Sequence, residues 1–458
     1  MTRRRLLAVF PVILLLVQTR LTAQTSNTSF DFSAVEATAQ KEMHDTQTPG
    51  AAIAVVLGDR VIYSRGFGVA NVETNEPLRP EMLFRLGSTT KMFTATALVG
   101  LAEKGAIDLN RPIGGYVKGL NGKIAQVTAH QLLSHTAGFL DEAPMFGSSD
   151  ESALEKEVRS WTESRFFTEP SKIYSYSNPG FWLAGFLVES LSGKPYADQM
   201  DGGLFKPLGM TRTTLRPLLA MTYPLALGHD ETPQGPKVVR PAANNTASWP
   251  AGSIFSNVSD LSRFVVAFVN GGRLDNTQVL SPTLITTLRT PRVKIPGSEA
   301  QYGYGLEIVR SRGVEIVRHG GSRSGYGSMI LMVPERHFGV VVLANRTGTG
   351  MSRTVNKAME TVLSLEPAKP TPSRPATTFG AAEIHDYIGT YSQGARTMEI
   401  VGRDGKIVLK QQTRESALVK VGDAEIEVPD QAHFVVIRGA DGAVEYLHGG
   451  GRSWRKVR

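Results

Sequence analysis

The chain is organised around one stretch, Phe84-Arg85-Leu86-Gly87-Ser88-Thr89-Thr90-Lys91-Met92-Phe93-Thr94-Ala95. Apolar residues recur at helical spacing from Met92 to Ala102, and Lys104-Gly105 supplies a basic last turn followed by a glycine stop. We therefore predict a helix that begins near Ser88. Because residues three apart share one face of a helix, the lysine at position 91 lies within reach of the serine hydroxyl.

The start of a helix is a favourable place for a nucleophilic serine. Free backbone N–H groups and the positive end of the helix dipole favour negative charge beside Ser88. The apolar neighbours Met92 and Ala95 favour the neutral amine of Lys91, which can accept a proton. The same pair also fits an ordinary N-cap followed by a surface lysine. A second Ser-x-x-Lys, Ser453…Lys456, lies where no room for a helix remains, so the motif alone decides nothing.

Composition limits the function classes. The 458 residues allow two or three domains, and 41% hydrophobic with 20% charged residues is typical of a globular protein. The absence of cysteine excludes cysteine nucleophiles, cysteine-ligated zinc, iron–sulfur clusters and disulfides. The chain has a net charge of +8, but its Lys and Arg residues form no run interleaved with aromatic residues. We therefore predict no nucleic-acid partner.

The first residues are typical of an export signal. Arg3-Arg4-Arg5 precede an apolar run over 6–17, and Leu21-Thr22-Ala23 offers a cleavage site. We predict a signal peptide over 1–23 and an exported protein, periplasmic or secreted, with no stable membrane span after cleavage. An uncleaved anchor is the alternative, although the apolar run is short for a span.

Hydrophobic periodicity predicts an α/β protein of the α+β type. One helix is expected over 30–48, a hairpin over 51–57 and 61–67, and a closing helix over 355–365. Residues 106–250 read as an inserted helical lobe. Strand patterns return in four runs, over 305–310, 314–319, 327–333 and 339–344. Their short turns predict antiparallel neighbours, and with the hairpin they form one sheet of at least five strands within a domain over 24–365.

A second domain is expected at the C-terminus. Residues 366–379 form a proline-rich linker, which is extended and semi-rigid. Over 380–458, short β runs alternate with Asp-Gly turns, which predicts a small all-β module of six or seven strands, a meander or partial barrel.

Two further motifs complement the serine. Tyr176-Ser177-Asn178 is the only Tyr-x-Asn in the chain. A phenol beside a lysine can carry a proton, and a carboxamide can orient the lysine or a substrate amide. An ordinary turn before Pro179-Gly180 is the alternative.

The other motif is Arg318-His319-Gly320-Gly321-Ser322, at the end of a β run. Its glycines allow a ligand to approach the backbone closely. The N–H of Ser322 can pair with that of Ser88 as an oxyanion hole. A bulge or hairpin turn is the alternative. His135, in the loop after 129–134, is interpreted as a structural hydrogen-bonding residue.

In this order, Ser88-x-x-Lys91, Tyr176-x-Asn178 and His319-Gly320-Gly321 resemble the three active-site motifs of the serine β-lactamase/penicillin-binding-protein superfamily. Within it, the chain is most similar to the class C β-lactamase-related serine hydrolases, which include esterases, D-stereospecific peptidases and D-aminopeptidases. The flanks agree over 30–365, among them "LLSHTAGF" at 132–139, "YSNPGFWLAGFLVESLSGKPY" at 176–196, "YGYGLEI" at 302–308 and "VVVLAN" at 340–345.

The resemblance implies a fold and a set of roles. The fold is an antiparallel sheet flanked by helices with an inserted all-helical lobe, and the C-terminal module resembles lipocalin-like accessory domains. Ser88 is implied to be the acylated nucleophile, with Lys91 and Tyr176 passing its proton to the leaving group. Asn178 positions Lys91 and the substrate, and the N–H groups of Ser88 and Ser322 hold the oxyanion. No metal or cofactor is implied.

One departure concerns charge. The third motif of lactamases and transpeptidases usually begins with lysine, which suits a substrate carboxylate, whereas His319 is mostly neutral near pH 7. This weakens the case for efficient β-lactam hydrolysis, and Arg318 or Arg323 could supply the missing charge. We expect His319→Lys to increase affinity for carboxylate-bearing substrates and to flatten any pH response near neutrality.

The function predicted from the sequence is an exported serine hydrolase acting through a Ser88 acyl-enzyme. Its substrate is a small molecule or peptide-like compound, an ester or an amide, and D-residues and weak β-lactamase activity are both compatible with it. The alternative is a recognition protein that binds penicillin or wall peptides without turnover. The accessory domain is expected to shape the mouth of the site or to mediate assembly into a homo-oligomer.

Overall fold

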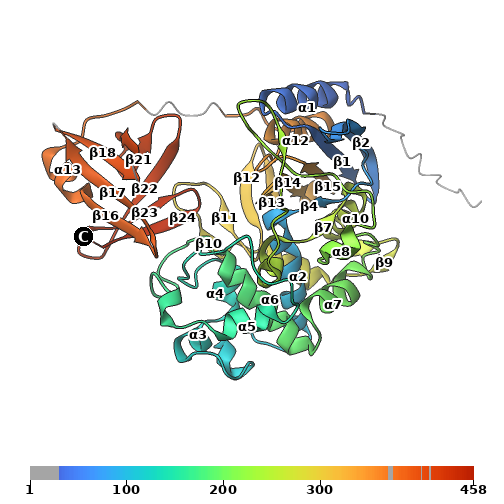
Figure 1. The fold of residues 1–458 in the computed structure, drawn as a ribbon, viewed down its shortest axis with the longest axis horizontal. Coiled ribbons are helices and arrows are strands. Elements are labelled where there is room, and N and C mark those ends of the chain that lie inside the picture. The colour runs from blue at the N-terminus through green and yellow to red at the C-terminus, as the bar shows by residue number, and fades with distance from the viewer. Residues whose placement is uncertain (1–29, 370–374, 404, 412–413, 458) are drawn as a thin grey trace, which may run out of the picture. The chain divides into compact units, whose positions relative to one another are not determined.

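One large antiparallel sheet organises the larger domain of the fold. The computed structural model describes residues 30–369, 375–403, 405–411 and 414–457, so the predicted signal peptide lies outside the described residues. The strand order is β10-β11-β12-β13-β14-β15-β1-β2-β3 (Figure 1). The bounds are β10 (Val293–Lys294), β11 (Gln301–Tyr302), β12 (Glu307–Ser311), β13 (Val314–Arg323), β14 (Tyr326–Val333), β15 (Phe338–Ala344), β1 (Gly50–Leu57), β2 (Arg60–Asn71) and β3 (Glu76–Pro77).

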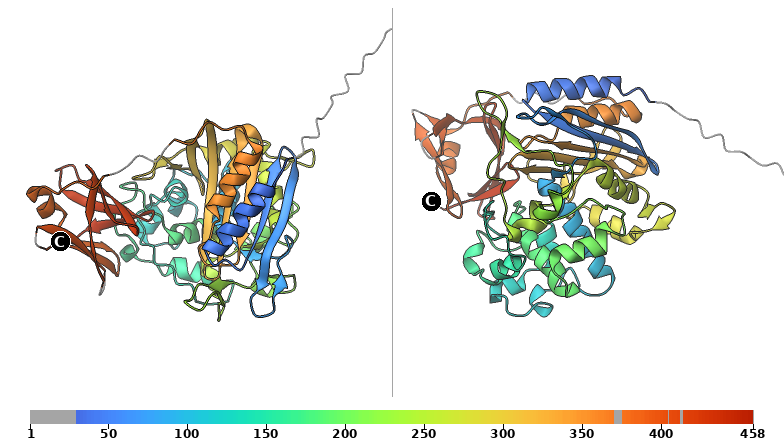
Figure 2. Two further views of the ribbon diagram at one scale, coloured as in Figure 1. Left: turned by 90° about the horizontal axis from the view of Figure 1, so that it is seen from above. Right: turned by 45° about the vertical axis from the view of Figure 1, so that its right-hand side comes forward.

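Helices cover both faces of this sheet. On one face lie α1 (Ser33–Asp45) and α12 (Ser352–Val362), seen side by side across the strands in Figure 2. Alternate residues of β1 serve the two faces, since Ile53 packs with α1 and α12 whereas Ala54 packs in the larger core on the other face. Because β1 is covered on both sides, it reads as a continuous apolar run. The predicted antiparallel sheet and its two flanking helices are confirmed.

The other face packs against the helical part of the chain. At its centre lies α2 (Thr90–Glu103), whose first ten residues include nine buried ones. Around it lie α3 (Gly122–Gln126), α4 (Ala129–Leu133), α5 (Ala153–Arg159), α6 (Asn178–Ser192), α7 (Tyr196–Met200), α8 (Pro217–Ala220), α9 (Trp249–Gly252), α10 (Val258–Val269) and α11 (Pro282–Arg289). The predicted lobe is mainly helical, with two-residue strands β5 (His229–Asp230) and β6 (Lys237–Val238) inside it and β4 (Phe84–Arg85) paired to β7 (Phe255–Ser256) at its edges.

The C-terminal module has its own sheet and its own core. Its strand order is β19-β18-β17-β16-β24-β23-β22-β21-β20, and Tyr391, Ile407, Ile426 and Leu447 are among its buried residues. The bounds are β16 (Gly389–Gln393), β17 (Arg396–Arg403), β18 (Lys406–Gln411), β19 (Arg414–Ala417), β20 (Val419–Gly422), β21 (Glu425–Val428), β22 (Ala432–Arg438), β23 (Val444–Gly449) and β24 (Arg452–Lys456), preceded by helix α13 (Ala381–Tyr387).

The prediction of six or seven strands is therefore wrong, because the described part of the module has nine, whereas the all-β, near-barrel class is confirmed. Four-residue strands such as β20 and β21 carry too few alternating residues to be separated by pattern alone. Residues Phe32–Arg458 form one compact unit, so the module and the larger domain belong to the same unit. In the described part of the chain, no helix combines the length and apolarity that crossing a bilayer requires.

Candidate active site

Ser88 lies in a tight turn just before α2. The turn spans Gly87–Thr89 and α2 begins at Thr90, so Ser88 stands at the entrance of the helix, as the sequence predicts. Gly87 has φ +58°, a conformation that favours glycine. A β-carbon built there would lie 2.6 Å from the backbone nitrogen of Ser322. The glycine therefore allows the serine turn to lie directly against the third motif.

The third motif lies inside a strand. β13 runs on to Arg323 and pairs with β14 in unbroken register, so neither a bulge nor a hairpin turn occurs at His319-Gly320-Gly321. The pairing of β12 with β13 ends at the pair Glu307↔Arg318, and beyond it the Ser88 turn lies against β13. A β-carbon built at Gly321 would lie 1.9 Å from the carbonyl oxygen of Leu86. The close approach that Gly321 permits is therefore that of the chain itself.

Lys91 lies beneath Ser88 and is completely buried. Its Nζ is 3.1 Å from Ser88 Oγ, 2.7 Å from Asn178 Oδ1 and 2.8 Å from the carbonyl oxygen of Ala251. Burial lowers the pKa of Lys91 well below its usual value, while Asp141 acts to raise it and Arg452 and Arg323 to lower it. A neutral amine has two N–H donors. They are taken by the carboxamide oxygen of Asn178 and the carbonyl oxygen of Ala251, which can only accept. Its lone pair is then left for the proton of Ser88.

The second motif leads into α6. Ser177 caps this helix by accepting a hydrogen bond from the N–H of Gly180, which places Asn178 at the first helical position. The backbone N–H and the Nδ2 of Asn178 both donate to Asp141 Oδ1, at 2.8 and 3.0 Å. Since a carboxylate only accepts, Asp141 fixes the carboxamide with its oxygen toward Lys91.

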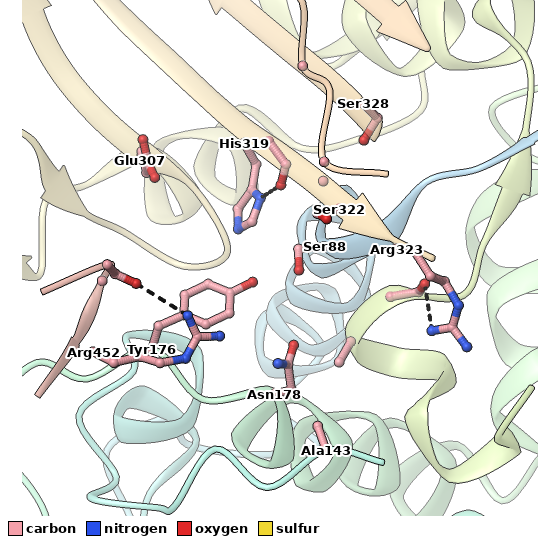
Figure 3. Close-up of a pocket in the computed structure, with 18 of the residues that line it drawn as sticks. Ser88, Ala143, Tyr176, Asn178, Glu307, His319, Ser322, Arg323, Ser328 and Arg452 are labelled. Carbon is pink, nitrogen blue, oxygen red and sulfur yellow. Dashed lines mark hydrogen bonds between the residues drawn. The ribbon is translucent and has the colours of Figure 1, made fainter. Parts of the chain in front are cut away.

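Tyr176 contributes a neutral phenol. Its hydroxyl points toward Ser88 (Figure 3) and has no hydrogen-bond partner among the described residues. Burial raises the pKa of Tyr176 well above its usual value, against an opposing effect of the Ser88 hydroxyl. The ring packs at 4.2 Å between centroids on the imidazole of His135. The phenol is thus held beside the nucleophile in its protonated form.

His135 and His319 are joined through Tyr302. The N–H of Ser177 donates to His135 Nδ1 at 3.1 Å, so His135 carries its proton on Nε2, 3.2 Å from the Tyr302 hydroxyl. That hydroxyl in turn donates to His319 Nε2 at 3.0 Å, which leaves the proton of His319 on Nδ1, directed at the carbonyl of Gly320 at 2.6 Å. The interpretation of His135 as a structural residue agrees with these contacts.

His319 therefore lines the site as a neutral ring. Burial is the largest cause that lowers its pKa from 6.5 to about 4, and Glu307 opposes it. That His319→Lys flattens any pH response near neutrality stays a prediction, and the lowered pKa of His319 argues against this ring as the source of such a response. The network around it also supplies no positive charge for a substrate carboxylate.

The three motifs meet around one cavity of about 930 Å³ (Figure 3). Ser88, Tyr176, Asn178, Gly320 and Gly321 line it together with His319 and Ser322. Lys91 lies below its floor. This volume is within the range of small-molecule sites.

Two arginines were candidates for the missing charge. Arg318 is occupied by Glu307, with Nε 3.1 Å from Oε2. Arg323 lines the cavity, and its Nη1 donates to the carbonyl of Gly252 at 3.2 Å. Its Nε and Nη2 are buried without a partner among the described residues. Burial, and next the charge of Arg85, lowers the pKa of Arg323 to about 9. Arg323 is thus a cation of this wall with two N–H groups that lack a partner among the described residues.

Sequence reasoning missed two residues of the site, Asp141 and Arg452. Asp141 follows the "LLSHTAGF" segment without any motif of its own, and Arg452 belongs to the C-terminal module. The neighbouring Ser453…Lys456 pair is not a second catalytic site. Ser453 is buried and donates to the carbonyl of Tyr174 at 2.9 Å, and Lys456 is bonded to the carbonyl of Asp386.

Known proteins resemble both the sequence and the fold. The family model described as Beta-lactamase matches residues 35–361, which confirms the resemblance. "Unguisins hydrolase ungD" of Aspergillus violaceofuscus is 29% identical over 336 residues, 66% of this chain and 59% of that protein. The chain spans about three fifths of the length of the curated relatives it matches.

Two solved structures share the fold. "Crystal structure of SurE" has a TM-score of 0.73 at 22% identity and covers 93% of this chain and 98% of its own. The D-amino acid amidase from Ochrobactrum anthropi SV3, complexed with L-phenylalanine amide, has a TM-score of 0.61 at 24% identity, over 72% and 98%. The first match extends into the C-terminal module, because the catalytic part alone is shorter than that coverage.

Proposed function

The chain belongs to the β-lactamase family, and we propose that it is a serine hydrolase which acts on esters or amides through an acyl-enzyme at Ser88. The observation that carries this proposal is the environment of Lys91. Both N–H groups of its neutral amine are taken by Asn178 and Ala251, and its lone pair faces Ser88 Oγ at 3.1 Å. A buried neutral lysine so placed is a general base for the serine.

The geometry supports a complete acylation step. Ser88 Oγ attacks the scissile carbonyl while Lys91 takes its proton, and the carbonyl oxygen becomes an oxyanion. The N–H groups of Ser88 and Ser322, brought together by the close contact at Gly87, are placed to receive that charge. The oxyanion then collapses and the bond to the leaving group breaks, while Tyr176, held neutral by burial, donates its proton to the leaving group and regains one from Lys91. Water then attacks the ester of Ser88 and releases the acid.

We propose a peptide-like substrate with an anionic group near the scissile bond. The D-amino acid amidase among the similar structures supports amide chemistry, with D-residues included, and the unguisins hydrolase supports hydrolysis. The anionic group is suggested by Arg323, which lines the cavity and whose buried Nε and Nη2 have no hydrogen-bond partner among the described residues. Because His319 is neutral, β-lactam hydrolysis is expected to be weak.

Export to the periplasm or beyond the cell is a further proposal, which rests on the pattern of residues 1–23. It is tested by the N-terminal residue of the mature protein isolated from its host. Association into a homo-oligomer stays a prediction.

A fluorophosphonate probe tests the proposed activity directly. We expect one adduct per chain, on the peptide that contains Ser88, and no adduct in Ser88→Ala. Lys91→Ala should be labelled at least about 100-fold more slowly, because it has lost its base. Labelling that is unchanged in Ser88→Ala would refute the proposal.

The proposed anionic substrate is tested by measuring KM of Arg323→Met for two amides that differ only in whether they carry a carboxylate. The variant should raise KM for the anionic amide and leave KM for the neutral one within about twofold. Equal effects on the two amides would refute the assignment of Arg323.

A further inference from the structure

The turn between β23 and β24 of the C-terminal module reaches the active-site cavity. Gly450, Gly451 and Arg452 line the cavity that also contains Ser88 (Figure 3). The N–H of Tyr176 donates to the carbonyl of Gly451 at 2.9 Å, and the N–H of Ser453 donates to Ser175 Oγ at 3.1 Å. The turn thus runs alongside the second motif and bonds to it at two places.

Arg452 makes the strongest contact of this turn. Its Nε and Nη2 lie 2.7 and 2.6 Å from Asp141 Oδ2, and its Nη1 donates to the carbonyl of Gly450 at 3.2 Å. The Asp141 side chain is only 4% exposed and that of Arg452 29%. One carboxylate oxygen is therefore taken by Arg452, while the other receives both hydrogen bonds from Asn178.

We propose that Arg452 is a positioning residue of the active site, which holds Asp141 so that Asn178 presents its oxygen to Lys91. The proposal rests on the proposed function of Ser88 and Lys91. It gives the C-terminal module a part in catalysis, because Asn178 and Arg452 are the two partners of the Asp141 side chain among the described residues, and Arg452 is the one that holds its second oxygen. A guanidinium held by two short contacts is well suited to fix a carboxylate in one orientation.

The charge of Arg452 matters as well as its geometry. Asp141 acts to raise the pKa of Lys91, and Arg452 acts to lower it. The other cation acting on Lys91 is Arg323, which also lowers its pKa. The remaining titratable groups near Lys91 are neutral, since burial lowers the pKa of His135 and His319 and raises that of Tyr176. The ion pair therefore lets a carboxylate orient Asn178 without protonating the base.

Removing either Arg452 or Asp141 should shift the pH dependence of the reaction of Ser88 in a known direction. Without Arg452, the charge of Asp141 is uncompensated, so Lys91 keeps its proton to higher pH. Asp141→Asn retains an oxygen for Asn178 but removes the negative charge, so Lys91 loses its proton at lower pH. The carboxamide of Asn178 separates the amine of Lys91 from the carboxylate of Asp141, with contacts of 2.7 Å to Lys91 and 3.0 Å to Asp141. At roughly 8 Å and an effective dielectric constant of about 20, removing the charge of Asp141 moves the pH dependence by about 1.5 units, and removing the more distant charge of Arg452 moves it by about 1 unit.

The test measures the rate of fluorophosphonate labelling of Ser88 from pH 5 to pH 10. We expect the acid limb to move up by about 1 unit in Arg452→Met, down in Asp141→Asn, and back toward the wild-type position in the double variant. Arg452→Lys should recover most of the wild-type profile. Arg455→Met is the matched control, because Arg455 is an exposed arginine of the same strand.

Each outcome decides the proposal. An acid limb at the wild-type position in both Arg452→Met and Asp141→Asn would overturn it, as would equal effects of Arg452→Met and Arg455→Met. If Arg452→Met does not fold, as judged by its melting curve, the test rests on Asp141→Asn. A downward shift of its acid limb supports the proposal, and an unshifted acid limb overturns it. Wild-type protein that is not labelled at Ser88 would instead overturn the proposed function, and the inference with it.

Discussion

The contact between Gly321 and the serine turn gives the sharpest single substitution. A β-carbon at Gly321 would lie 1.9 Å from the carbonyl oxygen of Leu86 and 2.7 Å from Thr89 Oγ1. Leu86 O also accepts a hydrogen bond from Ser328 Oγ at 2.6 Å, so the backbone of the turn is held in place. The neighbouring Gly320 differs, because its β-carbon would first meet Met329 Cε, the end of a flexible side chain, at 3.3 Å.

The size of the effect follows from these distances. Ordinary contacts begin at 3.4 Å, so Gly321→Ala must push Leu86 O away by about 1.5 Å. Overpacking of this kind costs about 1–3 kcal/mol of the free energy of unfolding. Leu86 is two residues from the nucleophile, and a displacement of about 1 Å in a reacting group costs about 100-fold in rate. Gly320→Ala needs a shift of about 0.1 Å, which Met329 can absorb by rotating.

The assay pairs urea denaturation with the rate of Ser88 labelling. Both variants gain the same unfolded-state benefit of Gly→Ala, so their difference reports the native contact. We expect Gly321→Ala to be less stable by about 1–3 kcal/mol and to be labelled about 100-fold more slowly. Gly320→Ala should stay close to wild type in both measurements. Equal stability and equal labelling of the two variants would refute the reasoning.

Three other predictions concern the residues around the nucleophile. Tyr302→Phe leaves the Nε2 atoms of His135 and His319 without partners and should cost about 1–3 kcal/mol of stability for each buried group. Since the pKa of His319 falls from 6.5 to about 4 on folding, the unfolded state binds the proton first. The free energy of unfolding should therefore drop by up to about 3 kcal/mol as the pH falls from 6.5 to 4, and His319→Gln should lose this part of the dependence. Asn178→Ala removes an acceptor of Lys91 and the partner of Asp141, and should slow labelling about 100-fold while a neutral probe still enters the cavity.

Matched variants separate these effects from general destabilisation. Tyr304→Phe removes a hydroxyl with one partner, His130, and should cost less than Tyr302→Phe. Exposed His44→Gln should keep the pH dependence that His319→Gln loses. Equal losses in the two tyrosine variants, identical pH profiles in the two histidine variants, or wild-type labelling of Asn178→Ala would each contradict the corresponding prediction.

Local sequence patterns predict the central strands of the large sheet and the helix after Ser88. The apolar runs of β14 and β15 and the helical spacing after Ser88 are properties of short segments, so the sheet and α2 follow from them. The full length of β13 does not follow from a local pattern. Two glycines normally weaken a strand, but here Gly321 is required by the carbonyl of Leu86, a neighbour that no local pattern reveals.

The site shows the same limit. Ser88 and Lys91 are three residues apart and could be paired from sequence, and the resemblance placed Asn178 beside them. Asp141 and Arg452 are 311 residues apart, and neither stands in a recognisable pattern. Their roles arise only when the C-terminal module is placed against the loop before α6. The neutrality of His319 likewise depends on burial and on Tyr302, which the order of residues does not show.

The most direct test of the central claim is a rapid acid quench during turnover of an activated ester, followed by mass analysis of the Ser88 peptide. The account predicts an acyl group on Ser88 that forms before product is released and disappears when the substrate is exhausted. It also predicts that Lys91→Ala accumulates this species far more slowly. Product release without any adduct on Ser88 would contradict the account. An adduct that persists for hours without turnover would contradict hydrolysis and indicate a recognition protein.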